Sequence, residues 1–135
     1  MTTPQHEVHT QSGRTAAQVF TANDRMNQML IEHLDPAAWR AKPPGNVRTI
    51  AAIFTHVHNM RAKWVRLTAP HLGVPAQLNR AHCTPQQACA ALAESAARCG
   101  EMLAEAIDND EGGDGEGRRV GRRYNLLMPV SGSAG

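Results

Sequence analysis

Two histidines, His56 and His58, stand two residues apart in the segment TIAAIFTHVHNMRAKW, which runs from Thr49 to Trp64. Imidazole nitrogens are common ligands of zinc and other divalent metals, so each histidine is a candidate ligand. If the segment is helical, side chains two positions apart point about 200° away from each other. The two rings cannot then bind one ion together. A metal site here needs one of these histidines and ligands from other segments.

The segment has the apolar spacing of a helix that begins at Thr49, whose hydroxyl can cap the first turn. The large apolar residues that fall on one face of this helix are Ile50, Ile53, Val57, Met60, Trp64 and Leu67. His56 lies at one margin of this face and His58 at the other, so the spacing alone does not choose between them. A histidine at such a margin is more often a packed or half-exposed residue than a ligand.

Other reactive groups form no recognisable catalytic motif. The sequence contains no G-x-S-x-G elbow and no phosphate-binding loop. His82 and Cys83 are adjacent, but adjacency just before a helix is a weak signal for a Cys–His pair. Cys83, Cys89 and Cys99 are odd in number and lack C-x-x-C spacing, which favours reduced thiols and a cytoplasmic location.

Length and charge exclude several classes of protein. A chain of 135 residues fits one domain, and a formal net charge of +2 is too small to indicate nucleic-acid binding. No window approaches the run of about 18 apolar residues that a membrane span requires. The first residues, MTTPQHEVHTQSGRT, lack the apolar region of a secretory signal. We therefore expect neither nucleic acid nor membrane as a partner.

Three amphipathic helices must position these groups, and we predict them over residues 15–34, 49–68 and 85–107. Thr84, Pro85 and Gln87 match a T-x-x-Q capping box with proline at the first helical position, which marks the start of the third helix. The predicted fold class is an all-α, up-down antiparallel bundle. Residues 1–14 are expected to form a disordered lead, and residues 108–135 a flexible, glycine-rich tail.

The pattern TANDRMNQMLIEHL, followed by a tryptophan, KPPG and RTIAAIFTHVHNMRAKWV, resembles the DinB/YfiT-like superfamily over about residues 16–107. The resemblance implies a four-helix bundle that binds a divalent metal, such as zinc or nickel, through three histidines. One family ligand lies on the second helix and two form an H-x-x-x-H pair on the last. It also implies kinship with thiol-dependent transferases. His56 matches the ligand on the second helix, whereas His58 matches none.

The departure from the family pattern concerns the other two ligands. The last of the seven histidines is His82, so no H-x-x-x-H pair follows the third helix, and the fourth helix is not matched. A natural truncation, a shifted reading frame or divergence would each produce this pattern. In an up-down-up arrangement, Asn27 and Cys99 lie level with His56. We therefore predict that His56 faces the bundle interior or its open seam, near Asn27 and Cys99, and that His58 lies nearer the surface.

The resulting functional hypothesis is a DinB-like protein with an incomplete divalent-metal site at His56, which is not catalytically active as it stands. The alternative is a metal-dependent thiol transferase or hydrolase whose site is completed by another subunit. A bundle without its fourth helix also leaves an apolar seam uncovered, and this seam predicts a homodimer. The residues expected to be buried are Phe20, Leu30, Ile53, Val57, Met60, Trp64, Leu92, Ala96 and Leu103.

Overall fold

The computed structural model describes residues 9–111, and all regular structure in this part of the chain is helical. The elements are α2 (Gln11–Glu32), η1 (Pro36–Ala38), α3 (Ile50–Thr68), η2 (Pro70–Leu72) and α4 (Pro85–Glu111). The predicted all-α fold is confirmed. None of the described helices is long and apolar enough to cross a membrane. The predictions for residues 1–8 and 112–135 lie outside the described residues.

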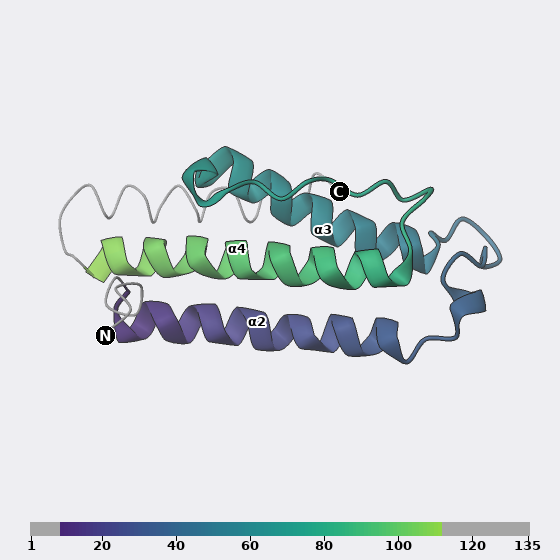
Figure 1. Cartoon of the computed structure of the whole chain (residues 1–135), viewed down its shortest axis with the longest axis horizontal. Helices are drawn as coiled ribbons and strands as arrows, with labels where there is room; N and C mark the ends of the chain where they lie inside the picture. The colour runs from purple at the N-terminus through teal and green to yellow at the C-terminus, as the bar shows by residue number, and fades with distance from the viewer. Residues whose placement is uncertain (1–8, 112–135) are drawn as a thin grey trace.

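Helix α4 lies between α2 and α3, and α2 runs antiparallel to both of them (Figure 1). Helices α3 and α4 run in the same direction, which corrects the predicted alternation of the three helices. Ala51 and Ala88, near the two helix starts, share one buried cluster, while Ala69 and Ala106, near the two ends, share another. The reason is the connection over residues 73–84, which returns in an extended form along α3 before α4 begins.

Capping side chains explain where α3 and α4 begin. The Thr49 hydroxyl accepts a hydrogen bond of 3.1 Å from the Ala52 amide at the start of α3. At α4, the Gln87 amide donates to the Thr84 hydroxyl at 3.1 Å, and the Thr84 amide donates to the Gln87 side chain at 3.0 Å. Each bond satisfies an amide that has no partner within its helix. The predicted starts of both helices are therefore confirmed.

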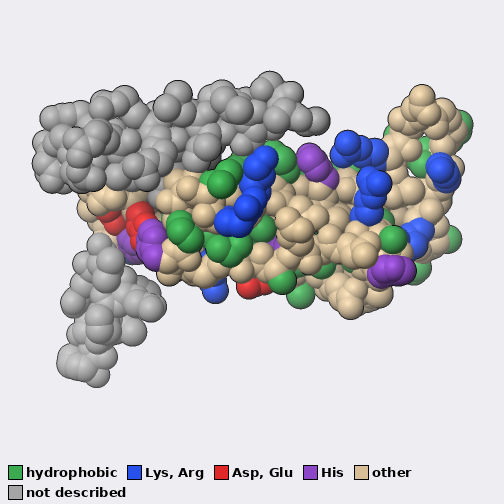
Figure 2. Space-filling model, turned by 90° about the horizontal axis from the view of Figure 1, so that it is seen from above, with side chains coloured by type: hydrophobic (Ala, Val, Ile, Leu, Met, Phe, Trp, Pro, Cys, Tyr) green, Lys and Arg blue, Asp and Glu red, His purple; other side chains and the backbone are tan. Residues whose placement is uncertain are grey.

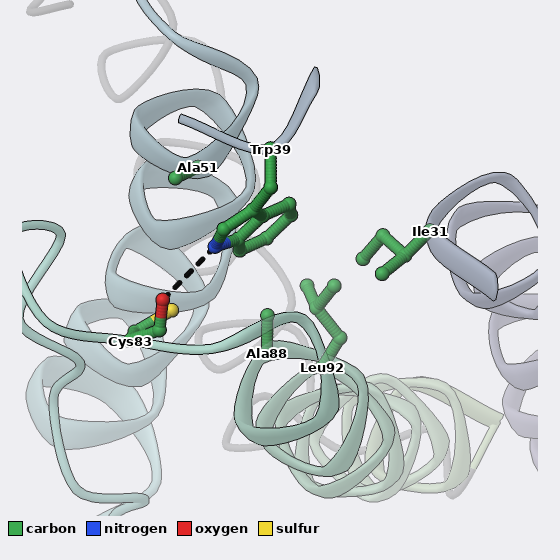
Figure 3. Packing of buried hydrophobic residues seen from close by; sticks show 6 residues of the cluster. All are labelled: Ile31, Trp39, Ala51, Cys83, Ala88 and Leu92. Atoms are coloured by element: carbon green, nitrogen blue, oxygen red, sulfur yellow. Dashed lines mark hydrogen bonds between the residues drawn. The ribbon is translucent and has the colours of Figure 1, made fainter. Parts of the chain in front are cut away.

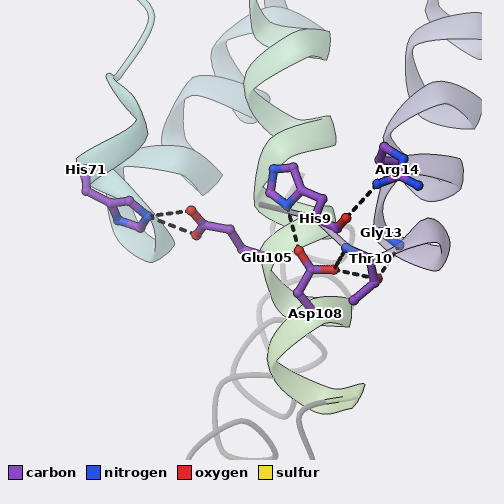
Figure 4. A network of polar contacts seen from close by, with 7 residues as sticks. All are labelled: His9, Thr10, Gly13, Arg14, His71, Glu105 and Asp108. Carbon is purple, nitrogen blue, oxygen red and sulfur yellow. Dashed lines mark hydrogen bonds and ion pairs between the residues drawn. The ribbon is translucent and has the colours of Figure 1, made fainter. Parts of the chain in front are cut away.

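Helix α2 begins at Gln11, earlier than the predicted Thr15, because its first turn is anchored on α4 (Figure 4). The Thr10 hydroxyl accepts from the Gly13 amide at 3.0 Å and donates to Asp108 Oδ1 at 2.6 Å. The Thr10 amide donates to the same oxygen at 2.9 Å, and His9 Nδ1 lies 2.6 Å from Asp108 Oδ2. Residues 9–14 of the expected disordered lead are therefore ordered by Asp108.

The end of α4 also differs from the prediction, since the helix continues past Ile107 to Glu111. This extra turn contains Asp108, whose carboxylate holds the start of α2. Gly13 permits the close approach of the two helices, because a Cβ atom there would lie 2.4 Å from Asp108 Oδ1. A contact that joins residues almost 100 positions apart is invisible to the local propensities that predict helix ends.

The buried cluster at the other end of the bundle surrounds Trp39, which lies just after η1 (Figure 3). Its indole Nε1 donates a hydrogen bond of 2.9 Å to the Cys83 carbonyl, and its ring stacks on Phe54 with centroids 6.4 Å apart. The buried members of the cluster are Ile31, Trp39, Ala51, Cys83, Ala88 and Leu92. Trp39 thus joins the loop after α2 to the connection that precedes α4.

The predicted core is confirmed at two positions on α4 and is half-buried or exposed at the others. Leu92 and Ala96 are buried, at 0% and 1% exposure. The predictions that Leu30 and Ile53 are buried are wrong, because 60% and 44% of their surfaces are exposed. The remaining predicted core residues are half-buried: Phe20, Val57, Met60, Trp64 and Leu103.

The predicted core residues of α3 are not fully buried because most of the residues that face α4 are small. Its buried stripe consists of Ala51, Thr55, His58, Ala62 and Val65, which recur at helical spacing. Small side chains let helix backbones approach closely, so this stripe packs against α4 while the larger residues turn away from it. The prediction followed the largest apolar residues, whereas α3 buries mainly small residues together with His58 and Arg61.

Candidate functional site

His56 is exposed and lines an open pocket of about 600 Å³ on the surface of α3. One wall comes from α3, and the opposite wall comes from the connection that precedes α4. The lining residues are Arg48, Ala52, Thr55, His56, Asn59, Gln77, Leu78, Asn79 and Arg80. On the face shown in Figure 2, Lys and Arg side chains gather beside a histidine in the half of the molecule where α3 begins.

Hydrogen bonds from α3 hold the outer wall of this pocket in place. Asn59 Nδ2 donates to the Leu78 carbonyl at 3.1 Å, and the Leu78 amide donates to Asn59 Oδ1 at 2.9 Å. His58 Nε2 lies 2.8 Å from the Ala76 carbonyl, to which it donates in the matching tautomer. The main chain of this connection is therefore held along α3 at Ala76 and at Leu78.

The two histidines have exchanged the positions predicted for them. His58 is fully buried, with 0% exposure, whereas His56 lies at the surface. The prediction that His56 faces the bundle interior is wrong because the small-residue stripe of α3 turns His58 inward. The connection then covers His58 and accepts its hydrogen bond. His58 Nδ1 is buried without a hydrogen-bond partner in the described part of the chain.

Asn27 and Cys99, the other predicted site residues, lie away from the His56 pocket. Asn27 Nδ2 donates to Asp24 Oδ1 at 3.2 Å, within α2. Cys99 is packed in the cluster formed with Val65 and Ala69, and its thiol lies 3.9 Å from the Arg61 carbonyl. The parallel direction of α3 and α4 places Cys99 beside Arg61 instead of His56. The three predicted residues are therefore not brought together.

Cys99 is poorly suited to act as a metal ligand or nucleophile in this position. Burial raises the pKa of its thiol to about 11, and the Asp24 carboxylate adds to this effect, although Arg61 opposes it. The thiolate is the form that binds metals and attacks electrophiles. At neutral pH the protonated thiol dominates, so Cys99 behaves as a small core residue.

A buried ion pair between Asp24 and Arg61 was not predicted from the sequence. Arg61 NH1 lies 2.8 Å from Asp24 Oδ1, and both residues are buried, at 8% and 1% exposure. Asp24 is seven residues before the buried Ile31 and so shares its helix face. That spacing was the available signal, but a charged residue on a core face is usually assigned to solvent.

The remaining described histidines are dispersed over the structure. At the end of the bundle opposite the pocket, His71 Nε2 lies 2.9 and 3.0 Å from the two carboxylate oxygens of Glu105 (Figure 4). His9 pairs with Asp108 at the same end, and His33 Nδ1 bonds to the Met29 carbonyl at 2.9 Å. Among residues 9–111, no three His, Cys, Asp or Glu side chains gather as a metal-binding group.

The lining of the His56 pocket does not fit a divalent metal. A catalytic zinc ion normally has three protein ligands drawn from imidazole, thiolate and carboxylate groups. His56 is one imidazole, but within residues 9–111 the pocket lining contains no thiolate, carboxylate or second imidazole. It contains instead the guanidinium groups of Arg48 and Arg80, which repel a cation. Whether His56 binds a metal in solution stays a prediction.

Comparison with known proteins identifies one family. The model of the DinB superfamily matches residues 20–124 of this chain, which is more than half of its length. Neither the comparison with curated proteins nor the comparison with solved structures gave a match.

Proposed function

This chain belongs to the DinB superfamily, and on that premise we propose that it is a binding protein with an incomplete divalent-metal site. It is not a metal-dependent enzyme as a single chain in this proposal. The observation that supports it is the surroundings of His56, the residue that matches the family ligand. Two arginines and three amide side chains line its pocket, and its described lining offers no second group of the kind that binds zinc.

The energetics of metal binding support this proposal. A divalent ion must shed several waters when it enters a protein site, and several ligands together offset that cost. One exposed imidazole offers a single bond, and the neighbouring guanidinium groups raise the electrostatic energy of a cation in the pocket. We therefore expect His56 to hold zinc no more tightly than an ordinary surface histidine.

Metal analysis of the full-length, untagged protein tests the proposal. Metal content is measured after purification, and zinc is then titrated by calorimetry into the wild type, His56→Ala and His82→Ala. His82 is the matched control because it is also exposed and makes no side-chain contact among the described residues. We expect no stoichiometric metal, and equally weak zinc binding by all three proteins.

The contrary result has a specific meaning. One equivalent of zinc that is lost in His56→Ala and kept in His82→Ala overturns the proposal. It would show that another subunit, or a part of the chain beyond the described residues, completes the site. The alternative of a metal-dependent thiol transferase or hydrolase would then stand in its place.

A homodimer and a cytoplasmic location complete the proposed function. Val19, Met26 and Leu30 form an exposed apolar stripe on α2, with 53%, 61% and 60% of their surfaces exposed. This stripe lies on the side of α2 away from the buried Ile31, so a second copy of the chain could cover it. All three cysteines are free thiols, which supports a reducing compartment.

A further inference from the structure

The His56 pocket carries positive charge that no acidic residue in its described lining balances. Arg48 lies just before the start of α3, and Arg80 lies on the connection that forms the opposite wall. Both arginines are exposed, and within residues 9–111 neither guanidinium makes an ion pair or a hydrogen bond. Among the described residues, no Asp or Glu lines the pocket.

A third arginine, Arg40, adds to this charge because it bonds to the main chain of the connection. Arg40 NH1 donates to the Arg80 carbonyl at 2.7 Å, and Arg40 NH2 donates to the Cys83 carbonyl. Its side chain therefore bonds to main-chain oxygens, and in the described part of the chain no carboxylate pairs with it. Several guanidinium groups near one concave surface create a positive potential that attracts anions and raises their local concentration.

The pocket is already organised before any ligand enters. Asn59 holds Leu78 through two hydrogen bonds, and Arg40 holds the main chain at Arg80. Asn79 Oδ1 accepts from the Ala81 amide at 2.9 Å, which fixes a turn within the connection. The side chains of Arg40, Asn59 and Asn79 thus position the backbone around Arg80. Pre-organisation of this kind lowers the entropy that a ligand must overcome on binding.

We propose that this pocket binds a small organic anion, with Arg48 and Arg80 pairing to its carboxylate or phosphate group. Guanidinium groups match both of these groups geometrically and form charge-assisted hydrogen bonds with them. A volume of about 600 Å³ suits a small metabolite. His56 and Gln77 line the same pocket and offer hydrogen bonds to neutral parts of the ligand. This inference rests on the proposed function, in which no metal occupies the pocket.

Titration with two simple anions tests the proposal on the full-length chain. The protein is passed over a chelating resin, and sodium phosphate or sodium acetate is added at low ionic strength while amide NMR signals are followed. We expect saturable shifts for one or both anions at residues around the pocket, with Kd on the order of 1 mM. The double variant Arg48→Gln/Arg80→Gln is expected to bind at least about tenfold more weakly, because the charge-assisted bonds are lost.

The control variant is Arg25→Gln/Arg66→Gln, which removes the same charge from exposed arginines on α2 and α3, outside the pocket lining. We expect it to bind like the wild type. An absence of saturable binding by either anion overturns the proposal, and so does equal weakening in the control, which would indicate general surface charge. If acetate binds and phosphate does not, or the reverse, the ligand class is a carboxylate or a phosphate respectively.

Folding and metal binding are checked separately so that each failure can be identified. Arg48 and Arg80 are exposed and make no side-chain hydrogen bond or ion pair among the described residues, and Arg25 and Arg66 are exposed as well, so both variants should melt at the wild-type temperature. If the double variant is unfolded, Arg48→Gln alone provides the comparison. Failure of the proposed function appears as zinc binding at His56 in the metal titration. Failure of the anion proposal appears in the metal-free titration, whatever the zinc result.

Discussion

Asp24 of α2 and Arg61 of α3 form a buried ion pair of 2.8 Å that bridges two helices lying on either side of α4. Asn27 and Gln28 donate to the two carboxylate oxygens of Asp24, at 3.2 and 2.8 Å. Arg61 also lies over the ring of Phe20, with 5.3 Å from its Cζ atom to the ring centroid. Each charge therefore has several partners, which is the condition for a buried pair to be tolerated.

Removal of Arg61 should be strongly destabilising, because Asp24 would remain buried with an uncompensated charge. We expect Arg61→Met to lower the free energy of unfolding by about 3–5 kcal/mol. The double variant Asp24→Leu/Arg61→Met should recover much of this loss, since no buried charge remains. Urea denaturation followed by circular dichroism measures both values. A loss below about 1 kcal/mol in the single variant would show that the pair is open to solvent.

Asp108 should make the stability of the fold depend on pH in the acidic range. Partial burial alone would raise the pKa of Asp108, but hydrogen bonds from Thr10 and His9 outweigh it and hold the pKa below its usual value. A carboxyl group with a lowered pKa stabilises the fold above its ordinary pKa of about 3.9. This contribution is lost as the pH falls through the lower pKa of the folded state. The stability advantage over an Asp108 variant should therefore shrink below about pH 4.

The variant Asp108→Asn measures this contribution. At pH 7 we expect it to unfold with a free energy about 1–2 kcal/mol lower than the wild type, because the charge-assisted bonds to the α2 cap are weakened. Asp110→Asn is the matched control, since Asp110 is exposed on the same helix and makes no side-chain contact among the described residues. Equal effects of the two variants would contradict a specific role for Asp108.

The proposed homodimer predicts a change of mass on mutation of α2. Met26 is the most exposed large apolar residue of the stripe on this helix, at 61%. Met26→Glu places a charge in the proposed interface, and burying an unpaired charge is costly. Light scattering should report a dimer for the wild type and for the exposed control Gln18→Glu, and a monomer for Met26→Glu. A wild type that is a stable, non-aggregating monomer would rule the dimer out.

Local signals in the sequence were sufficient to predict the helices and two of their starts. Thr49 and the Thr84–Gln87 box act through hydrogen bonds within a few residues, so their roles can be inferred without the fold. The family was likewise predicted from the sequence pattern, and the match over residues 20–124 confirms it. These features depend on neighbours in the chain.

The arrangement around His56 could not be predicted in the same way. It depends on the direction in which α4 follows α3, and the 73–84 connection is long enough for either direction. The parallel direction separates His56 from Cys99, and the alanine-rich stripe of α3 turns His58 inward. The pocket itself joins Arg48 to Arg80, which lie far apart in the sequence. Each of these features is a consequence of tertiary packing.

The pairing of α2 with α4 also has a consequence for the order of folding during synthesis. Helix α2 leaves the ribosome before α3 and α4, yet its main packing partner is α4, and Thr10 cannot bond to Asp108 until α4 has been made. Until that helix has been made, the apolar residues of α2 have no native surface to cover them. Contacts between such distant segments form slowly, because a long loop must close before they give any stability. The nascent chain is therefore prone to aggregation until the last turns of α4 emerge.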